Sequence, residues 1–316
     1  MIQELEKILK ENWGSFFSDK AVSDKFYFIL KRRLHSYQIF IFAGKDKFPI
    51  CIMKTPLEDK NECIVNEINL VSMKSEDLFQ NELSFLLKLE KINLGESSIP
   101  RILYQGEIAN RKIALQSILP GLNMIDYTSQ GNLKKHASIV LEWLIRFHKK
   151  TEQSNLVFDQ ANTRDFLASF KKDEDLATLA IGNSVPLVAV HGDFRVDNFL
   201  IDRNKLIVLD WERSKFASFG LFDLFFYWAR QGRLICDTRS ERPDKDPCIT
   251  TKSFIATFFK GNKISAMAEE NILFYCNAFN IKPEATRFIF LLWLIEFWDN
   301  PLLMRIFLEK KKDFLC

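Results

Sequence analysis

The stretch from Val188 to Glu212 constrains the fold of this chain more than any other part of the sequence. It reads VAVHGDFRVDNFLIDRNKLIVLDWE, so that two apolar segments, Val188–Val190 and Leu206–Leu209, flank a polar loop. Short apolar runs rich in β-branched residues and bounded by polar turns are typical of buried strands. The stretch therefore predicts two strands with a polar loop between them and an acidic residue at the end of the second strand.

The polar residues of this stretch form a set rich in oxygen atoms. Asp193 and Asn198 stand on the loop, and Asp210 follows the next apolar segment. Carboxylate, amide and phosphate oxygens are the ligands that Mg²⁺ prefers. A carboxylate that is not occupied by the metal can accept a proton from an attacking hydroxyl. These residue types predict a magnesium-dependent site that also contains a general base.

The order and spacing of these residues resemble the aminoglycoside phosphotransferase and choline kinase superfamily, whose fold is that of the protein kinases. The family pattern is an apolar-flanked His-Gly-Asp-x-x-x-x-Asn, then an apolar strand and Asp-Trp/Phe-Glu, and HGDFRVDN and LIVLDWE match it. The resemblance implies an α+β, protein-kinase-like bilobal fold. Its N-lobe would be a small antiparallel β-sheet with one helix, and its larger C-lobe would be mostly helical.

The resemblance also implies a role for each residue of the motif. Asp193 is expected to align the acceptor hydroxyl as the catalytic base, while Asn198 and Asp210 hold Mg²⁺ on the phosphates of ATP. Arg195 stands where protein kinases place a lysine that touches the transferred phosphate; the alternative is an arginine that faces solvent or substrate. The resemblance further implies structural support of the loop by His191 and Asp223.

The first third of the chain is rich in aromatic and β-branched residues and contains one segment with helical spacing of apolar residues. Such patterns predict a five-stranded antiparallel sheet with one helix. The helix is expected over Ser75–Leu89. The expected strands are Phe26–Lys31, Tyr37–Phe42, Phe48–Lys54, Ile99–Ile108 and Lys112–Leu119.

By the same resemblance, this N-terminal part binds the nucleotide. Lys54 closes the third strand, and Glu82 lies on the helix among leucines, so the two are expected to pair around the α- and β-phosphates. The loop between the first two strands contains no glycine, which leaves Ser36 and Arg33 to contact the phosphates in place of backbone amides. The hinge strand is expected to bind the adenine edge through Gln116, Ser117 and Ile118.

The periodicity becomes helical after Pro120-Gly121. This change predicts an N-terminal nucleotide-binding lobe over 1–118, a hinge over 119–123 and a catalytic and substrate-binding lobe over 124–316. A polar segment, Gly232–Lys252, is expected to be a long loop. Helices are expected over Leu133–Lys149, Leu221–Arg230, Ser253–Phe259, Ser265–Asn280 and Glu284–Leu308.

The acceptor is less sharply indicated than the chemistry. A hydroxyl of a small molecule is expected, such as a sugar, an amino alcohol or an aminoglycoside. Arginines near the motif favour a neutral or anionic acceptor. A protein kinase and a catalytically silent binding or scaffold protein are the alternatives, although DWE stands where protein kinases have Asp-Phe-Gly. The candidate acceptor contacts are Trp211, Glu212, Trp228, Arg230, Trp298 and Asp299.

Composition excludes several other classes of function. A formal charge of +3 over 316 residues, without a basic stripe, argues against nucleic-acid binding. Six cysteines without a CxxC pair, and only four histidines, argue against a zinc site. The most apolar run, Phe288–Ile295, is far shorter than the roughly 20 residues of a membrane span and predicts a buried helix. Without a signal peptide, a cytoplasmic protein is expected.

Overall fold

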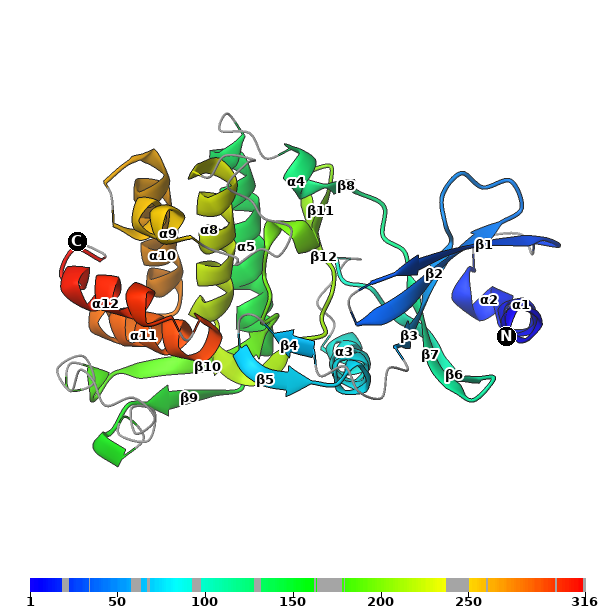
Figure 1. Ribbon diagram of the computed structural model, residues 1–316, viewed down its shortest axis with the longest axis horizontal. Coiled ribbons are helices and arrows are strands. Elements are labelled where there is room, and N and C mark those ends of the chain that lie inside the picture. The colour runs from blue at the N-terminus through cyan, green and yellow to red at the C-terminus, as the bar shows by residue number, and fades with distance from the viewer. Residues whose placement is uncertain are drawn as a thin grey trace. The chain divides into compact units, whose positions relative to one another are not determined.

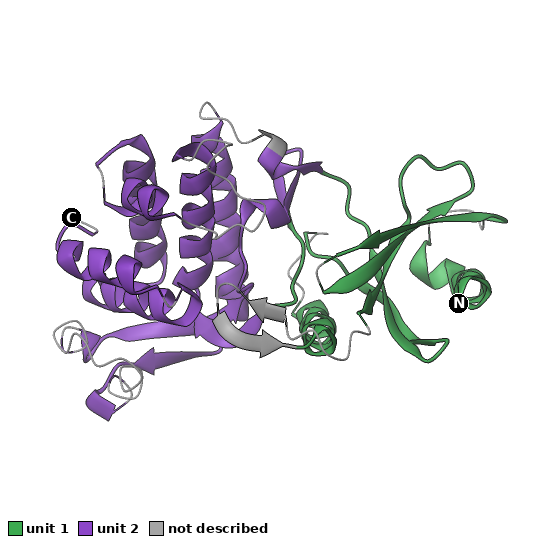
Figure 2. Ribbon diagram, viewed as in Figure 1, with its two compact units in different colours: residues 1–64, 72–121, 207–213 green, residues 65–71, 122–206, 214–316 purple. Residues whose placement is uncertain are grey.

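The chain folds into two compact units (Figure 2). The first unit comprises residues 1–64, 72–121 and 207–213, and the second comprises residues 65–71, 122–206 and 214–316. The structure is a computed structural model (Figure 1). It describes residues 1–18, 23–33, 35–57, 64–66, 69–92, 98–127, 132–161, 163, 178, 180–236, 250–259, 261–298 and 300–314.

The first unit is built on a five-stranded sheet of order β1-β2-β3-β7-β6. Every neighbouring pair in it is antiparallel, which confirms the expected sheet. The third strand begins three residues later than expected, because Phe48 lies in the preceding turn and is 79% exposed. The strands are β1 (Phe26–Arg32), β2 (Ser36–Ala43), β3 (Cys51–Pro56), β6 (Ile102–Ile108) and β7 (Arg111–Ser117).

The alternation of side chains along β3 and β7 gives this sheet two different faces. On one face, Cys51 and Met53 pack in a core with Leu5 and Leu9 of helix α1 (Ile2–Glu11). On the other face, Ala114 of β7 packs against Phe79 and Leu83 of helix α3 (Ser75–Glu90). Lys54 pairs in register with Ala114, so it belongs to the α3 face of the sheet. The short helix α2 (Trp13–Phe16) follows α1.

The second unit is mostly helical, as expected. Its long helices α5, α8 and α10 run side by side, and α9 and α11 pack on α8 (Figure 1). The helices are α4 (Met124–Tyr127), α5 (Leu133–Thr151), α8 (Leu221–Cys236), α9 (Thr251–Phe258), α10 (Lys263–Ala278), α11 (Pro283–Trp298) and α12 (Pro301–Lys310).

Three small sheets complete the chain, in the orders β13-β10-β9, β12-β11-β8 and β4-β5. The strand β10 and the strand β12 correspond to the two apolar segments that flank the polar motif. The strands are β4 (Ile64–Asn66), β5 (Asn69–Met73), β8 (Leu122–Asn123), β9 (Ser154–Val157), β10 (Ser184–Val190), β11 (Phe199–Asp202), β12 (Lys205–Val208) and β13 (Lys215–Phe219).

The apolar run Phe288–Ile295 lies in α11, as the buried helix that its composition predicts. Phe290 on this run is fully buried and contacts the rings of Phe225, Phe258 and Phe307. Within the described part of the chain, every helix is too short or too polar to cross a membrane.

The prediction of a single helix over Glu284–Leu308 is wrong, because the chain forms two helices there. α11 ends at Trp298, and α12 begins at Pro301. The Asn300 side chain caps α12 by accepting hydrogen bonds from the amides of Leu302 and Leu303. Proline at the first helical position lacks the amide that a continuing helix would need, so the helix restarts there.

The loop expected over Gly232–Lys252 is shorter than predicted at both ends. Helix α8 continues to Cys236. α9 begins at Thr251 behind a capping box of Thr250 and Ser253. Residues 237–249 lie outside the described part of the chain.

Gly232 permits the close approach of α8 and α9, and its substitution tests this packing. A Cβ on Gly232 would stand 2.9 Å from the Cβ of Thr257 and closer still to its hydroxyl. We expect Gly232→Ala to lower the free energy of unfolding by about 1–3 kcal/mol, as overpacking does. Urea denaturation measures the change. Gly14→Ala is the control because nothing described lies within 4 Å of its Cβ position. The clash explanation fails if adding Thr257→Ala to Gly232→Ala restores no stability.

Candidate functional site

The polar motif is held in place by apolar side chains that alternate with its polar ones. Phe194, Val196 and Phe199 are fully buried. The ring of Phe194 stacks on Trp143 of α5, with centroids 5.7 Å apart, and it also contacts Phe199. These buried side chains hold the loop between β10 and β11 against the core of the second unit. Asp193 and Arg195 alternate with them along the loop.

The backbone of the loop is fixed by Asp223 of α8. Its carboxylate accepts hydrogen bonds from the amides of His191 (2.8 Å) and Gly192 (3.0 Å). Gly192 has φ +76°, a conformation that glycine adopts without a steric penalty. The Nδ1 atom of His191 then accepts a hydrogen bond from the Asp193 amide (3.2 Å). His191 and Asp223 thus lie where the expected supporting residues should.

Asp193 is buried to 7% exposure and is surrounded by donors. The guanidinium of Arg195 reaches both carboxylate oxygens, with Nε 2.6 Å from Oδ1 and Nη2 2.7 Å from Oδ2. The Asn198 side-chain nitrogen donates to the Asp193 carbonyl (3.0 Å) and lies 3.4 Å from Oδ2. The structure therefore brings the predicted base, the predicted clamp and one predicted metal ligand together.

Arg230, a predicted acceptor contact, forms a bidentate pair in the structure. Its Nε and Nη2 donate to the two carboxylate oxygens of Asp197, at 2.7 and 2.9 Å. Asp197 lies in the short 3₁₀ helix η1 (Val196–Asn198), so the pair ties the loop to α8. The sequence carries no local signal for this pair because its members stand 33 residues apart.

His148 forms a buried layer beneath the Asp223 carboxylate. Its Nε2 lies 3.5 Å from Asp223, and its Nδ1 lies 2.7 Å from the Tyr275 hydroxyl. Burial lowers the pKa of His148, and the neighbouring Asp223 carboxylate opposes this shift without cancelling it. Burial also raises the pKa of the Tyr275 hydroxyl, which stays protonated.

In the first unit, Lys54 and Glu82 form a buried ion pair, as predicted. The Lys54 Nζ lies 2.7 and 2.9 Å from the two carboxylate oxygens of Glu82. Burial opposes the charge of Lys54, but the attraction of Glu82 and then of Asp210 outweighs it, so the pKa of Lys54 is raised. Lys54 is therefore a fixed cation.

Asp210 belongs to the same unit and completes this cluster. Its carboxylate lies 3.9 Å from the Lys54 Nζ, and its side chain is 43% exposed. Its backbone has φ +67°, a strained conformation for a residue other than glycine that often marks functional sites. The next residue, Trp211, is fully buried, stacks on Phe85 and donates to the Val208 carbonyl. That packing anchors Asp210 and favours a core role for Trp211 over acceptor contact.

Glu212 and His35 lie together beside this cluster. The His35 Nε2 is 3.8 Å from Glu212 Oε1. Burial, with repulsion from Asp210 and Glu82, raises the pKa of Glu212 to about 8. Burial lowers the pKa of His35, and Arg213 lowers it further against the opposing effect of Asp210.

No role for His35 in this site was expected from the sequence. Arg33 and Ser36 were expected to contact phosphate, whereas the structure turns Arg33 outward to Gln38 and places Ser36 in the β2 strand. The sequence signal for His35 is a histidine in the glycine-free turn between the first two nucleotide-binding strands.

The remaining predicted residues are placed as follows. Gln116 is buried, and the Ser117 amide and hydroxyl both bond the Arg101 backbone. Ile118 is half-buried just beyond β7. Trp228 is fully buried in α8, and Trp298 packs on Phe226 and Trp293. Asp299 lies outside the described residues. The burial of Trp228 favours a packing role there too.

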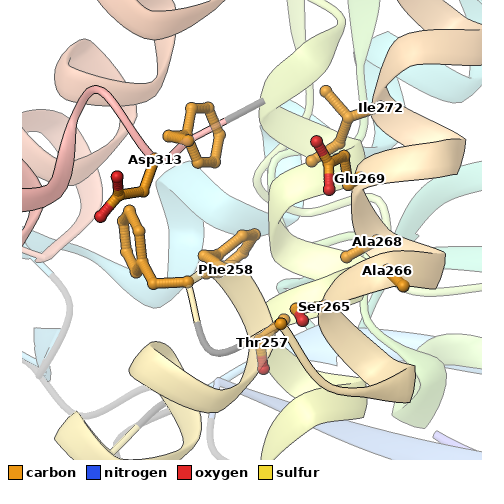
Figure 3. A pocket seen from close by; sticks show the side chains of 11 residues that line it. Thr257, Phe258, Ser265, Ala266, Ala268, Glu269, Ile272 and Asp313 are labelled. Carbon is orange, nitrogen blue, oxygen red and sulfur yellow. The ribbon is translucent and has the colours of Figure 1, made fainter. Parts of the chain in front are cut away.

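A cavity of about 220 Å³ opens elsewhere in the second unit (Figure 3). It lies between the end of α9, the first half of α10 and the C-terminal turn, where Glu269 and Asp313 face it with several aromatic rings. No predicted site residue lines it. The chemistry of the motif therefore does not depend on this cavity.

Comparison with known proteins identifies the family. The sequence model of the phosphotransferase enzyme family (APH) matches residues 72–246, more than half of the chain. The chain belongs to this family. The matched range contains the polar motif, Glu82 and Asp223, while Lys54 and His35 precede it. No curated protein matches the sequence of this phosphotransferase.

Solved structures of aminoglycoside phosphotransferases are similar to it over most of their length. The enzyme APH(3'')-Id from Streptomyces rimosus is 12% identical with a TM-score of 0.47, over 96% of this chain and 99% of that one. The ternary complex of APH(2")-IIa with streptomycin and ATP is 12% identical with a TM-score of 0.43, over 98% and 94%. A mutant APH(4)-Ia with ADP and hygromycin B is 12% identical, with a TM-score of 0.43 over 92% and 90%.

The donor atoms of the phosphotransferase suit Mg²⁺ in type. Because the Asn198 side-chain nitrogen donates to Asp193, its amide oxygen points away and can serve as a ligand. Asp210 offers a half-exposed carboxylate in the other unit. Among the described residues, no group of three or more His, Cys, Asp or Glu side chains could hold a metal ion.

The lowered pKa of His148 predicts how stability depends on pH. The unfolded chain binds a proton at His148 below about pH 6.5, and the folded protein does so only at lower pH. Stability is therefore lost as the pH falls below about 6.5. We expect His148→Gln to reduce this loss between about pH 7.5 and 5.5, measured by urea denaturation.

His136→Gln is the comparison for this measurement. Burial lowers the pKa of His136 as well, but that residue lacks a buried carboxylate partner among the described residues. Equal pH slopes for the wild type and His148→Gln would contradict the assignment.

Proposed function

We propose that the protein is an ATP- and Mg²⁺-dependent kinase that transfers the γ-phosphoryl group to a hydroxyl of a small molecule. Membership of the phosphotransferase family supports the reaction class. The observation that carries the proposal is the hydrogen-bonded cage around Asp193, in which Asp223, Arg195 and Asn198 fix the loop and the carboxylate. Such preorganisation suits phosphoryl transfer, where positioning and charge stabilisation supply most of the catalysis.

Asp193 would act as the base. The acceptor oxygen forms a bond to the γ-phosphorus, the bond from that phosphorus to the bridging oxygen breaks, and the hydroxyl proton passes to the carboxylate. A carboxylate has about four lone-pair sites, and the hydrogen bond from the Arg195 Nη2 to Oδ2 uses one of them. Arg195 can therefore orient Asp193 without blocking it. Its charge would also stabilise the transferring phosphoryl group.

The nucleotide would bind in the first unit. Lys54, kept charged by Glu82 and Asp210, would contact the α- and β-phosphates. Since the Ser117 amide already bonds Arg101, the adenine edge would be bound at Ile118 and the hinge beyond it, with Gln116 buried behind them. Asn198 and Asp210 would hold Mg²⁺, which neutralises phosphate charge when bound.

The acceptor would be a sugar, an amino alcohol or an aminoglycoside. Similar structures hold streptomycin and hygromycin B, which supports testing aminoglycosides first. Arg195 and Arg230 are paired with carboxylates, so they favour an anionic acceptor less than two unpaired arginines would. Glu212 and Trp298 remain candidate contacts on this proposal.

Asp193→Asn removes the proposed base and keeps the size of the side chain. We expect turnover to fall by at least about 10²-fold, because an amide cannot accept the proton, while ATP affinity changes little. ATP consumption over a panel of sugars, amino alcohols and aminoglycosides measures turnover, and calorimetry measures binding. Asp202→Asn, on β11 of the same unit, is the control and should stay active. Turnover by Asp193→Asn at the wild-type rate would refute the base assignment.

Lys54→Met tests the nucleotide role of the buried ion pair. Loss of the cation should weaken ATP binding by about 10-fold or more, the scale of a hydrogen bond to a charged group. Lys112→Met is a matched control, because Lys112 forms a strand-to-helix ion pair of the same length with Glu76 but is exposed. Equal ATP affinities for the two variants would remove Lys54 from the site. If the wild type bound ATP but phosphorylated nothing, a silent binding protein would be favoured.

A further inference from the structure

The turn between β1 and β2 is closed by its own backbone. Arg32 and Tyr37 form the last register pair, and the Arg33 amide donates to the Ser36 carbonyl at 2.8 Å. The Arg33 side chain is exposed and bonds Gln38. Because the turn contains no glycine, side chains hinder the close approach of its backbone amides to a phosphate that a glycine-rich loop allows.

The His35 side chain, by contrast, points into the first unit. It is 7% exposed, and its Nε2 lies 3.8 Å from Glu212 Oε1. Its Nδ1 is buried and has no hydrogen-bond partner among the described residues. The Leu57 amide donates to the His35 carbonyl at 3.4 Å, which ties the turn to the end of the strand that carries Lys54.

The surroundings of His35 distinguish it from another buried histidine. His136 on α5 is also 7% exposed and also has an unpaired Nδ1, but the charged group that acts on it is Lys135. His35 lies within the field of Asp210 and Arg213, in the cluster that contains Lys54. His35 and Lys54 thus share the charged neighbours Asp210 and Glu212, in the unit that is proposed to bind the nucleotide.

We propose that His35 donates a hydrogen bond from Nδ1 to a phosphate of the bound nucleotide, replacing the backbone amides of a glycine-rich loop. Glu212 orients the ring from the Nε2 side. This inference rests on the proposed nucleotide site. On this proposal His35 contacts the phosphates, and the hinge strand binds the adenine.

The test compares Mg²⁺–ATP affinity, by calorimetry, in variants that keep or remove the donor. His35→Leu should weaken binding by about 10-fold or more. His35→Asn places an amide nitrogen near the position of Nδ1 and should restore most of the affinity, whereas His35→Gln, whose amide reaches the Nε2 position, should not. His136→Leu is the matched control and should bind ATP like the wild type. If His35→Leu does not fold, the comparison of Asn with Gln decides.

A purely structural role for His35 gives a different pattern. The variants would lose thermal stability without a change in ATP affinity of the folded protein, and that result would overturn the proposal. The Lys54→Met variant distinguishes a failure of the proposed nucleotide site from a failure of the role proposed for His35. If that variant weakens ATP binding and His35→Leu does not, only the role of His35 is wrong. If the wild type binds no ATP, the proposed function and the role of His35 both fall.

Discussion

The polar motif depends on two hydrogen bonds that the buried Asp223 carboxylate accepts from backbone amides. A fully buried carboxylate is costly unless hydrogen bonds compensate it, and here the His191 and Gly192 amides do so. The same bonds fix the loop backbone from a helix, which is more rigid than a loop. Because the backbone is held this way, Arg195 and Asn198 can fix the side chain of Asp193. Preorganisation of this kind lets the site position reacting groups before substrate arrives.

A second constraint acts in the first unit, where sheet alternation decides which side chains meet α3. Met53 and Cys51 face the core with α1, so Lys54 must face α3, where Glu82 is buried. Burial alone would discharge a lysine, but two carboxylates reverse its effect on the pKa. The same crowding of carboxylates favours the neutral form of Glu212. Burial and the charges of Asp210 and Glu82 raise the pKa of Glu212 to about 8. One cluster therefore contains a fixed cation and a carboxyl group that is protonated near neutral pH.

The parts of this protein that could be predicted from sequence are those specified locally. Strand alternation led to the sheet, and the spacing of leucines led to α3. The motif spacing led to the loop around Asp193, and the family resemblance that it carries implied the Lys54–Glu82 pair. The break between α11 and α12 also had a local signal, Asn300-Pro301, which the strong apolar periodicity around it concealed. The Arg230–Asp197 and His35–Glu212 contacts had none, because they join residues distant in sequence whose meeting depends on the packed fold.

These tertiary contacts change how the charges around the motif are interpreted. The arginines near the motif favoured a neutral or anionic acceptor, yet Arg195 and Arg230 each form an ion pair with an aspartate of the loop. A cation whose charge is balanced within 3 Å exerts a weak field on a ligand farther away. Arg230 therefore positions the loop more than it attracts an anion. Glu212, a candidate acceptor contact, is protonated near neutral pH because its pKa is about 8, so it carries no negative charge there that would favour a cationic acceptor.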